Sequence, residues 1–356
     1  MPKYLIVAPS WVGDTVLAQP LLRRLLERNP GSTIDVLASP AVAPVLTRMA
    51  EVSAVIDHSF GHGELRLADR WRSARNIKQG GYDHAIVLPN SFKSALLPFF
   101  AGIAKRTGYV GEARYGLLND IRKLDEAGYP LMVERYALLA EAAGAPLQRP
   151  LPEPRLLVDE TARQATMNRL KVNSAGSPIV AFCPGAEYGP AKRWPAEHFA
   201  ALATSYLDNG DQVWLLGSSN DAQIAAEINR LCGNACRDFT GKTGLAEVID
   251  LLSCAARVVS NDSGLMHIAA ALDRPMAALY GSSSPLHTPP LSARARVVYL
   301  HLDCSPCYQR HCPLGHFNCM RQMQPELVRR TLEEVPIGSA TASASDISAF
   351  SGKRVI

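Results

Sequence analysis

The feature that most constrains this chain is residues 256–285, where two apolar runs flank a polar turn and a helical pattern. The first run, Arg257–Val259, leads into the turn Asn261-Asp262-Ser263-Gly264. Apolar residues then recur at helical spacing, and the second run, Met276–Tyr280, ends at Gly281. This order predicts a strand–turn–helix–strand unit. Its right-handed crossover would leave the turn at the carboxyl edge of a parallel sheet.

The turn of this unit suits an anionic ligand. Ser263 is a residue type that caps helices, and Gly264 lets a ligand approach the backbone. The helix that follows presents free N–H groups at its start, and His267 lies one turn deeper on the face of Ser263. The alternative is that Asp262, Ser263 and His267 only satisfy the turn, and spacing alone leaves both interpretations open.

Strand and helix patterns alternate along both halves of the chain. In the first half we expect a helix over 15–28, a basic helix with five cations (Arg66, Arg70, Arg72, Arg75 and Lys78), and strands at 4–8, 33–38, 52–57, 84–88 and 106–109. In the second half we expect strands at 178–182, 212–216, 257–259 and 276–280. The alternation predicts an α/β fold with two doubly wound, Rossmann-like parallel sheets.

A proline-rich segment separates the two halves. Residues 144–154 carry four prolines in eleven positions and cannot continue a helix. We therefore expect one domain over 1–150 and a second over 151–323. The remaining residues, 324–356, are expected to form a C-terminal helix and a mobile or weakly docked tail rich in Ser, Ala and Gly.

Charge and hydropathy indicate where the protein is located and which class of partner it binds. No run reaches the ~20 apolar residues of a spanning helix, and the apolar run at the start is too short for a secretory signal, so we expect a cytoplasmic protein. The net charge of +4 lies in the first half: residues 1–150 hold 18 Lys and Arg against 14 Asp and Glu, and the rest hold 19 against 19. This bias favours an anionic partner such as a phosphorylated glycan, an anionic membrane face or nucleic acid.

Three enzyme classes lack their signatures. The turn Ser10–Asp14 has only Gly13 of the three glycines in a dinucleotide fingerprint, which disfavours a nicotinamide-dependent dehydrogenase. Gly241-Lys242-Thr243 lacks the first glycine of a phosphate loop, because position 236 is Cys. Ser263 does not stand in a G-x-S-x-G elbow, which argues against a hydrolase.

Three loops carry residues suited to group transfer. Asp14 could accept a proton from a substrate hydroxyl, or it could cap the following helix. The loop over 183–194 ends in Lys192 and Arg193, which could neutralise a diphosphate leaving group or could simply be solvated. Asp221 could hold a pair of ribose hydroxyls, or it could cap the next helix.

A cysteine-rich segment follows the last predicted strand. Its four cysteines fall within sixteen residues, with two histidines among them: Cys304, Cys307, Cys312 and Cys319, and His311 and His316. Only the first pair has the spacing typical of zinc fingers. The pattern is compatible with a structural zinc site or an iron–sulfur cluster, and equally with unliganded thiols.

Six motifs stand in order along the chain: Ser10-Trp-Val-Gly-Asp14, Leu88-Pro-Asn-Ser-Phe-Lys-Ser-Ala95, Arg114-Tyr-Gly-Leu-Leu-Asn-Asp120, Cys183-Pro-Gly-Ala-Glu187, Pro190-Ala-Lys-Arg-Trp194 and Asn261-Asp-Ser-Gly-Leu-Met-His267. Together they resemble the heptosyltransferase II group of glycosyltransferase family nine, over residues 1 to about 300. The resemblance implies the GT-B architecture, in which two Rossmann-like domains face each other across a cleft. This agrees with the two predicted sheets.

The resemblance also implies an activity. An enzyme of this group inverts the anomeric centre as it moves L-glycero-D-manno-heptose from ADP-heptose to the first heptose of the lipopolysaccharide inner core, and its chemistry requires no cofactor. The implied partners are ADP-heptose, a heptosylated Kdo-lipid A acceptor and the anionic inner face of the inner membrane, with no nucleic acid.

Residue roles carry over position by position from the resemblance. Asp14 takes the role of general base and Lys192 that of the diphosphate contact. The implied donor site is Ser10, Gly13, Glu187, Lys192, Asp221, Asp262, Ser263, Gly264 and His267, and the implied acceptor contacts are Asn90, Lys93 and Arg114. Position 221 departs from the related heptosyltransferase I, which has Glu there, and the cysteine segment has no role in the family's chemistry.

Two kinds of alternative remain at this stage. One is another GT-B enzyme, either a heptosyltransferase with a different acceptor or a nucleotide-sugar 2-epimerase. The other is a non-catalytic protein that binds a nucleotide sugar. An epimerase would turn over the donor alone, whereas a transferase would release ADP only when the acceptor is present.

Overall fold

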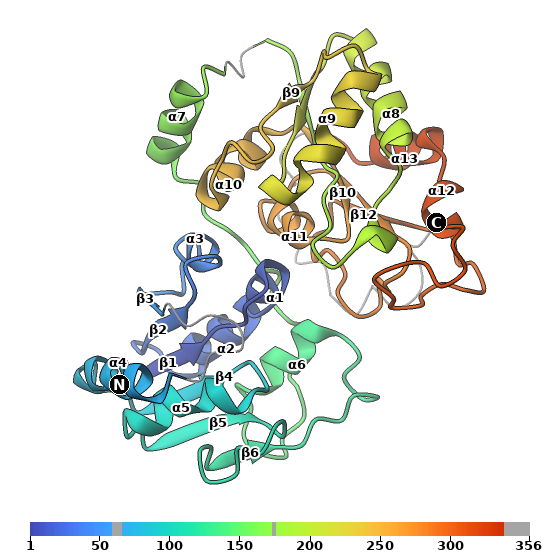
Figure 1. Cartoon of the computed structure of the whole chain (residues 1–356). Helices are drawn as coiled ribbons and strands as arrows, with labels where there is room; N and C mark the ends of the chain where they lie inside the picture. The colour runs from blue at the N-terminus through green and yellow to red at the C-terminus, as the bar shows by residue number, and fades with distance from the viewer. Residues whose placement is uncertain (59–65, 173–175, 338–356) are drawn as a thin grey trace. The chain divides into compact units, whose positions relative to one another are not determined.

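A computed structural model describes residues 1–58, 66–172 and 176–337 of the chain (Figure 1). The chain divides into two compact units, Met1–Pro152 and Glu153–Ile356. The tail expected to be mobile lies almost entirely beyond residue 337, outside the described residues.

The first unit is built on a parallel sheet of six strands in the order β3-β2-β1-β4-β5-β6. Its strands are β1 (Lys3–Val7), β2 (Thr33–Ala38), β3 (Ala54–Asp57), β4 (His84–Val87), β5 (Lys105–Tyr109) and β6 (Asp120–Arg122). The chain runs from β1 out to β3 and then returns to place β4 on the other side of β1. The topology therefore switches direction between β1 and β4, which is where ligands bind in open α/β sheets.

The described part of this unit has five α-helices between its strands, α1 (Val12–Leu17), α2 (Gln19–Arg28), α3 (Ala43–Leu46), α4 (Leu67–Gln79) and α5 (Phe92–Phe100), and one after β6, α6 (Met132–Leu138). The single helix expected over 15–28 was wrong, because α1 ends at Leu17 and α2 begins after Ala18. Pro20 accounts for the break, since proline has no N–H and favours the first turn of a new helix.

One face of the first sheet packs beneath α4 and α5. Leu5 and Val7 of β1 alternate with residues of the other face and join Ala85 and Val87 of β4 in one buried cluster. The same cluster includes Ala74 and Ile77 of α4 and Ala95 and Leu97 of α5. Every second residue of β1 and β4 therefore packs with the buried residues of α4 and α5, as the sequence predicts.

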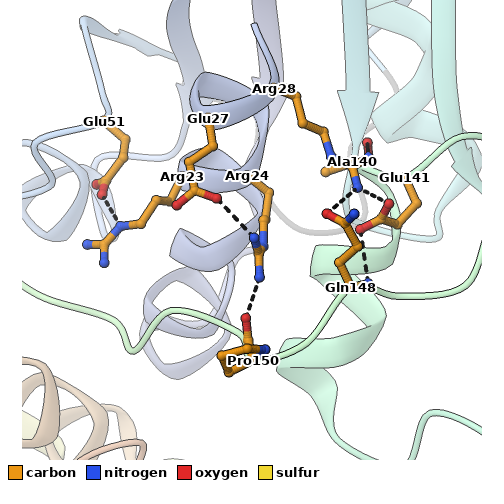
Figure 2. Close-up of polar contacts among 9 residues, drawn as sticks. All are labelled: Arg23, Arg24, Glu27, Arg28, Glu51, Ala140, Glu141, Gln148 and Pro150. Atoms are coloured by element: carbon orange, nitrogen blue, oxygen red, sulfur yellow. Dashed lines mark hydrogen bonds and ion pairs between the residues drawn. The ribbon is translucent and has the colours of Figure 1, made fainter. Parts of the chain in front are cut away.

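The proline-rich segment is anchored to the first unit by arginines of α2 (Figure 2). Arg24 donates to the carbonyl oxygen of Pro150, and Arg28 donates to the Ala140 carbonyl at 2.7 Å and pairs with the Glu141 carboxylate. Arg23 pairs with Glu51 at 3.0 Å on the other side of α2. The segment before Pro152 thus belongs to the first unit in its contacts.

The second unit repeats the plan with a parallel sheet in the order β12-β11-β10-β7-β8-β9. Its strands are β7 (Ile179–Cys183), β8 (Gln212–Leu215), β9 (Arg237–Asp238), β10 (Arg257–Asn261), β11 (Met276–Tyr280) and β12 (Ala295–Tyr299). The switch in direction falls between β7 and β10. The strand–turn–helix–strand unit predicted over 256–285 is confirmed as β10, α11 and β11.

The helices of the second unit are α7 (Glu160–Arg169), the 3-10 turns η1 (Pro190–Lys192) and η2 (Ser219–Asp221), α8 (Ala196–Asp208), α9 (Ala222–Leu231), α10 (Leu245–Cys254), α11 (Gly264–Ala271), α12 (Asn318–Arg321) and α13 (Pro325–Glu333). Val328 and Leu332 of α13 are fully buried in the core with residues of α8. The expected C-terminal helix is therefore present as α13 and packs in the core of this unit. Within the described ranges, no helix is long and apolar enough to cross a membrane.

We expect Leu21→Ala to lower the free energy of unfolding by about 2–5 kcal/mol, since Leu21 is fully buried and the substitution leaves a cavity. Leu67→Ala is the matched control, because Leu67 is 48% exposed and its loss should change stability by no more than about 0.5 kcal/mol. Urea denaturation followed by circular dichroism measures both. Equal effects of the two substitutions would contradict the burial of Leu21 in the first unit.

Candidate functional site

In the second unit, the predicted donor residues other than Asp221 follow two central neighbouring strands. β7 pairs in parallel with β10, so the loops after both strands emerge at the same edge of the sheet. Lys192 stands in the loop after β7, and Asp262 directly follows β10. The fold therefore brings both residues to the point where the sheet's topology switches.

One buried side chain fixes the loop after β7. Asn261, the last residue of β10, donates from Nδ2 to the Pro184 carbonyl at 2.7 Å and accepts at Oδ1 from the Trp194 backbone N–H at 3.1 Å. The two bonds hold both ends of the loop over 184–194 against β10. Asn261 is fully buried, so the loop's position depends on this pairing.

Lys192 and Asp262 form an ion pair at the centre of the site. The Lys192 Nζ lies 2.5 Å from Asp262 Oδ2, and Ser283 donates its hydroxyl to the same oxygen at 2.5 Å. The Asp262 side chain is 5% exposed and that of Lys192 is 18% exposed, so the lysine reaches solvent and the carboxylate does not. An ammonium has three donors, so pairing with Asp262 leaves Lys192 able to bind an anionic ligand.

The start of α11 adds backbone donors beside this pair. Ser263 occupies the N-cap position, as expected, but its side chain makes no capping hydrogen bond to the helix, and its Oγ lies 3.3 Å from Ser260 Oγ. The first N–H groups of a helix have no partner within the helix. The N-terminus of α11, which begins at Gly264, therefore has no side-chain cap from Ser263, and a helix start of this kind suits an anion.

His267 is a buried neutral imidazole in α11. Burial lowers the pKa of His267 to about 4; the nearby Asp262 carboxylate opposes the shift and the Lys192 ammonium adds to it. Within the described part of the chain, its Nδ1 is buried without a hydrogen-bond partner. A neutral imidazole can donate or accept a hydrogen bond but does not add charge to the site at neutral pH.

Asp221 and Glu187 lie in neighbouring loops of the same sheet edge. Asp221 Oδ2 accepts from the backbone N–H of Ser218 at 3.0 Å and from its hydroxyl at 2.8 Å, which are capping contacts. A Cβ at Gly185 would lie 2.3 Å from the Asp221 carboxyl carbon, so the backbone there packs directly on this carboxylate. Glu187 is exposed and accepts a hydrogen bond of 3.4 Å from the side chain of Asn220.

In the first unit, the predicted base also follows a central strand. Ser10, Gly13 and Asp14 follow β1, with Trp11 as the N-cap of α1, so Asp14 stands in the first turn and does not occupy the capping position. Asp14 is half-buried. The pKa of Tyr136 in α6 is raised well above its usual value. Burial of the tyrosine is the larger cause, and the negative charge of the Asp14 carboxylate is the smaller one.

Two of the predicted acceptor residues, Asn90 and Lys93, follow β4, the strand beside β1, and the third, Arg114, follows β5. Asn90 is exposed, Lys93 is half-buried near the start of α5, and Arg114 is almost fully buried. Arg114 donates to the Pro89 carbonyl at 2.6 Å, to Asn90 Oδ1 at 3.1 Å and to the Tyr109 carbonyl. These contacts occupy the Arg114 guanidinium in shaping the Asn90 loop.

The zinc site suggested by the cysteine spacing finds no support. Among the residues placed in the structure, no group of three or more His, Cys, Asp or Glu side chains could hold a metal ion. Cys304, Cys307, Cys312 and Cys319 are all free and partly buried. Their segment is held by other contacts, to the loops after β7 and β11.

Comparison with known proteins decides the family. The family model described as glycosyltransferase family 9 (heptosyltransferase) matches residues 70–318. The chain belongs to glycosyltransferase family 9. Among its relatives in this family, lipopolysaccharide heptosyltransferase 2 of Escherichia coli K12 is 45% identical over 94% of this chain and 97% of its own length. Lipooligosaccharide heptosyltransferase 2 of Haemophilus influenzae is 44% identical over 83% of this chain and 88% of its own length.

A solved structure of the family agrees with the fold. The structure of E. coli ADP-heptose lps heptosyltransferase II matches with a TM-score of 0.84 and 42% identity, over 94% of this chain and 98% of that one. The chain is therefore a glycosyltransferase of the GT-B-like architecture, with two parallel six-stranded sheets.

Sequence reasoning missed three residues that lie beside the predicted site residues of this family 9 chain. Asn261 and Ser283 hold the Lys192 loop and Asp262, and Tyr136 lies near Asp14. The run Ser282-Ser283-Ser284 directly after β11 was a signal for Ser283, because it stands at the same sheet edge as Asp262. Tyr136 lies far from Asp14 in sequence, and nothing local marked it.

We expect His267 to remain neutral far below the usual range of histidine. Its pKa of about 4 lies under the ordinary 6.5, so the unfolded chain binds the extra proton first. The stability contribution of neutral His267 should be complete above about pH 6.5 and lost as the pH falls toward 4.

The pKa of His267 can be measured by following its ring signals in two-dimensional NMR spectra as the pH is changed. The signals of His267 are those that are lost in the variant His267→Gln. A midpoint near 6.5 would contradict the buried neutral imidazole.

Proposed function

We propose that this chain transfers L-glycero-D-manno-heptose from ADP-heptose to the first heptose of the lipopolysaccharide inner core, with inversion at the anomeric carbon. The observation that carries the proposal is the Lys192–Asp262 ion pair beside the N-terminus of α11, which has no side-chain cap. The partly exposed Lys192 ammonium and the helix N–H groups stand at the switch point of the second sheet. Relatives that are 44–45% identical carry the name heptosyltransferase 2, which supports the choice of sugar.

The donor's diphosphate would bind through Lys192 and the first N–H groups of α11. As the bond between the anomeric carbon and the phosphate oxygen breaks, negative charge grows on ADP, and a fixed ammonium stabilises that charge. The contacts from Ser218 engage Asp221 Oδ2, whereas Asp221 Oδ1 is buried without a hydrogen-bond partner among the described residues and would accept from a ribose hydroxyl of the donor.

Asp14 would act as the general base. It would take the proton of the acceptor hydroxyl while the hydroxyl oxygen bonds to the anomeric carbon and ADP departs, which balances the reaction in one displacement. Its place after β1, the central strand at the switch point of the first sheet, supports this role. No metal or cofactor is needed for these steps.

The deciding experiment incubates the protein with ADP-heptose and an inner core truncated to a single heptose. We expect release of ADP that depends on the acceptor, and a product heavier by one heptose in mass spectrometry. Consumption of ADP-heptose without acceptor, with a change in the sugar's stereochemistry, would indicate an epimerase. Binding of the donor without turnover in either case would indicate a non-catalytic protein.

Asp14→Asn should lower the transfer rate by about 10²- to 10⁴-fold, the usual contribution of a general base, and leave ADP binding unchanged. Asp57→Asn is the matched control, because Asp57 is an exposed carboxylate at the end of β3 in the same unit. Initial rates and calorimetric ADP titration measure the two properties. Full activity in Asp14→Asn would remove the base assignment.

We further propose that the outer face of α4 contacts the anionic inner face of the inner membrane, where the acceptor is held. Leu67 and Trp71 are each 48% exposed and one helical turn apart. Arg75 lies over the Trp71 ring at 3.6 Å, and Arg72 and Lys78 are also exposed. Exposed apolar side chains with several cations on one helix suit an anionic lipid surface.

The double variant Leu67→Ser with Trp71→Ser should reduce co-sedimentation with vesicles that contain phosphatidylglycerol by about tenfold, given the apolar area removed. Leu231→Ser is the control, because Leu231 is 42% exposed at the end of α9 in the other unit. Equal binding by both variants, or equal binding to neutral phosphatidylcholine vesicles, would contradict the assignment of α4.

A further inference from the structure

The cysteine-rich segment after β12 has no part in the chemistry described above, yet it contacts the loop that carries Lys192. The Arg310 carbonyl accepts from the Ala191 backbone N–H at 3.1 Å, next to Lys192 in η1. Arg310 also donates from Nε to the Tyr188 carbonyl at 2.6 Å. Tyr188 in turn donates its hydroxyl to the Tyr308 carbonyl at 2.7 Å.

Two cations lie near the Tyr188 ring. The Lys192 Nζ is 5.1 Å from the ring centroid, and the guanidinium carbon of Arg310 is 5.4 Å from it. Both distances fall within the range of cation–π attraction. The backbone approaches Arg310 closely at Gly189, where φ is +154° and a Cβ would lie 2.6 Å from the Arg310 carbonyl oxygen. No side chain larger than that of glycine fits this approach.

The same segment also holds the loop after β11. Tyr308 donates its backbone N–H to the Ser282 carbonyl at 2.6 Å, and Ser305 donates its hydroxyl to the Gly281 carbonyl. Ser283, the next residue in that loop, donates to Asp262. Residues 305–310 therefore contact both loops that supply partners to the Asp262 carboxylate.

We propose that residues 305–310 form a brace that sets the position of the Lys192 ammonium, with Arg310 as the positioning residue acting through Tyr188. The inference rests on the proposed role of Lys192 as the diphosphate contact. It gives the cysteine-rich segment a mechanical role in donor binding that needs no metal. Arg310 acts on the ligand only by fixing where Lys192 stands.

A double-mutant cycle on ADP affinity tests this. The four proteins are the unmodified chain, Arg310→Ala, Lys192→Met and the double variant, each titrated with ADP by calorimetry after thermal melting confirms folding. Arg310→Ala should raise the Kd for ADP by roughly 5- to 30-fold, the effect of losing one side-chain hydrogen bond and one cation–π contact that hold the Lys192 loop. In the Lys192→Met background the same change should raise it less than about twofold, because coupled residues are not additive.

Three further variants support the double-mutant cycle as a control, a rescue and a replacement. Arg321→Ala is the matched control, an exposed arginine of the same segment that stacks on Phe317 and should leave the Kd unchanged. Arg310→Lys keeps a cation for the Tyr188 ring and should restore part of the affinity. If Arg310→Ala does not fold, Tyr188→Phe replaces it in the cycle, since it removes only the hydroxyl bond to Tyr308.

The outcomes separate the two proposals. Additive losses would mean that Arg310 touches the ligand itself or acts on the whole fold, and would overturn the brace. A loss in Lys192→Met with none in Arg310→Ala would overturn the brace and leave the proposed function standing. No loss in Lys192→Met would overturn the diphosphate assignment, and with it the route by which Arg310 is proposed to act.

Discussion

The ion pair between Lys192 and Asp262 is the interaction on which the second unit's site depends. Asp262 is nearly excluded from water, and a buried carboxylate is stable only when its charge is compensated. Lys192 and Ser283 supply that compensation on one oxygen, from loops that follow two different strands. Because the buried Asp262 carboxylate needs a positive partner, the ion pair fixes the position of the Lys192 ammonium. Because the ammonium still reaches solvent, the same residue can meet a second anion.

The two units share one arrangement of strands. Each has six parallel strands with a single change of direction, between β1 and β4 in the first and between β7 and β10 in the second. Loops that follow neighbouring central strands meet at the sheet's carboxyl edge, so polar residues far apart in sequence come together there. The first unit presents a carboxylate at this edge and the second presents a paired lysine with helix N–H groups. A transferase needs both functions, a base for the incoming alcohol and a positive site for the leaving phosphates.

Much of this could be predicted from the sequence, and the failures have physical causes. The strands β1, β7, β10 and β11 each have five residues and are flanked by clear turns, so the sequence pattern was sufficient to predict them. β6 and β9 have three and two residues, too short for a hydrophobic period, and exist because a neighbouring strand pairs with them. Arg114 is of a type usually found at surfaces, and only tertiary contacts show that it shapes the Asn90 loop. The cysteine spacing suggested a metal because soft ligands cluster in sequence. The fold instead uses that segment's backbone and the side chains of Ser305 and Arg310 to hold two loops.

The most direct test of the account is a crystal structure of the chain with ADP. The account predicts that the diphosphate lies at the switch point of the second sheet, with Lys192 Nζ about 3 Å from a phosphate oxygen and the first N–H groups of α11 directed at it. A diphosphate bound elsewhere, with Lys192 still engaged only by Asp262, would contradict it.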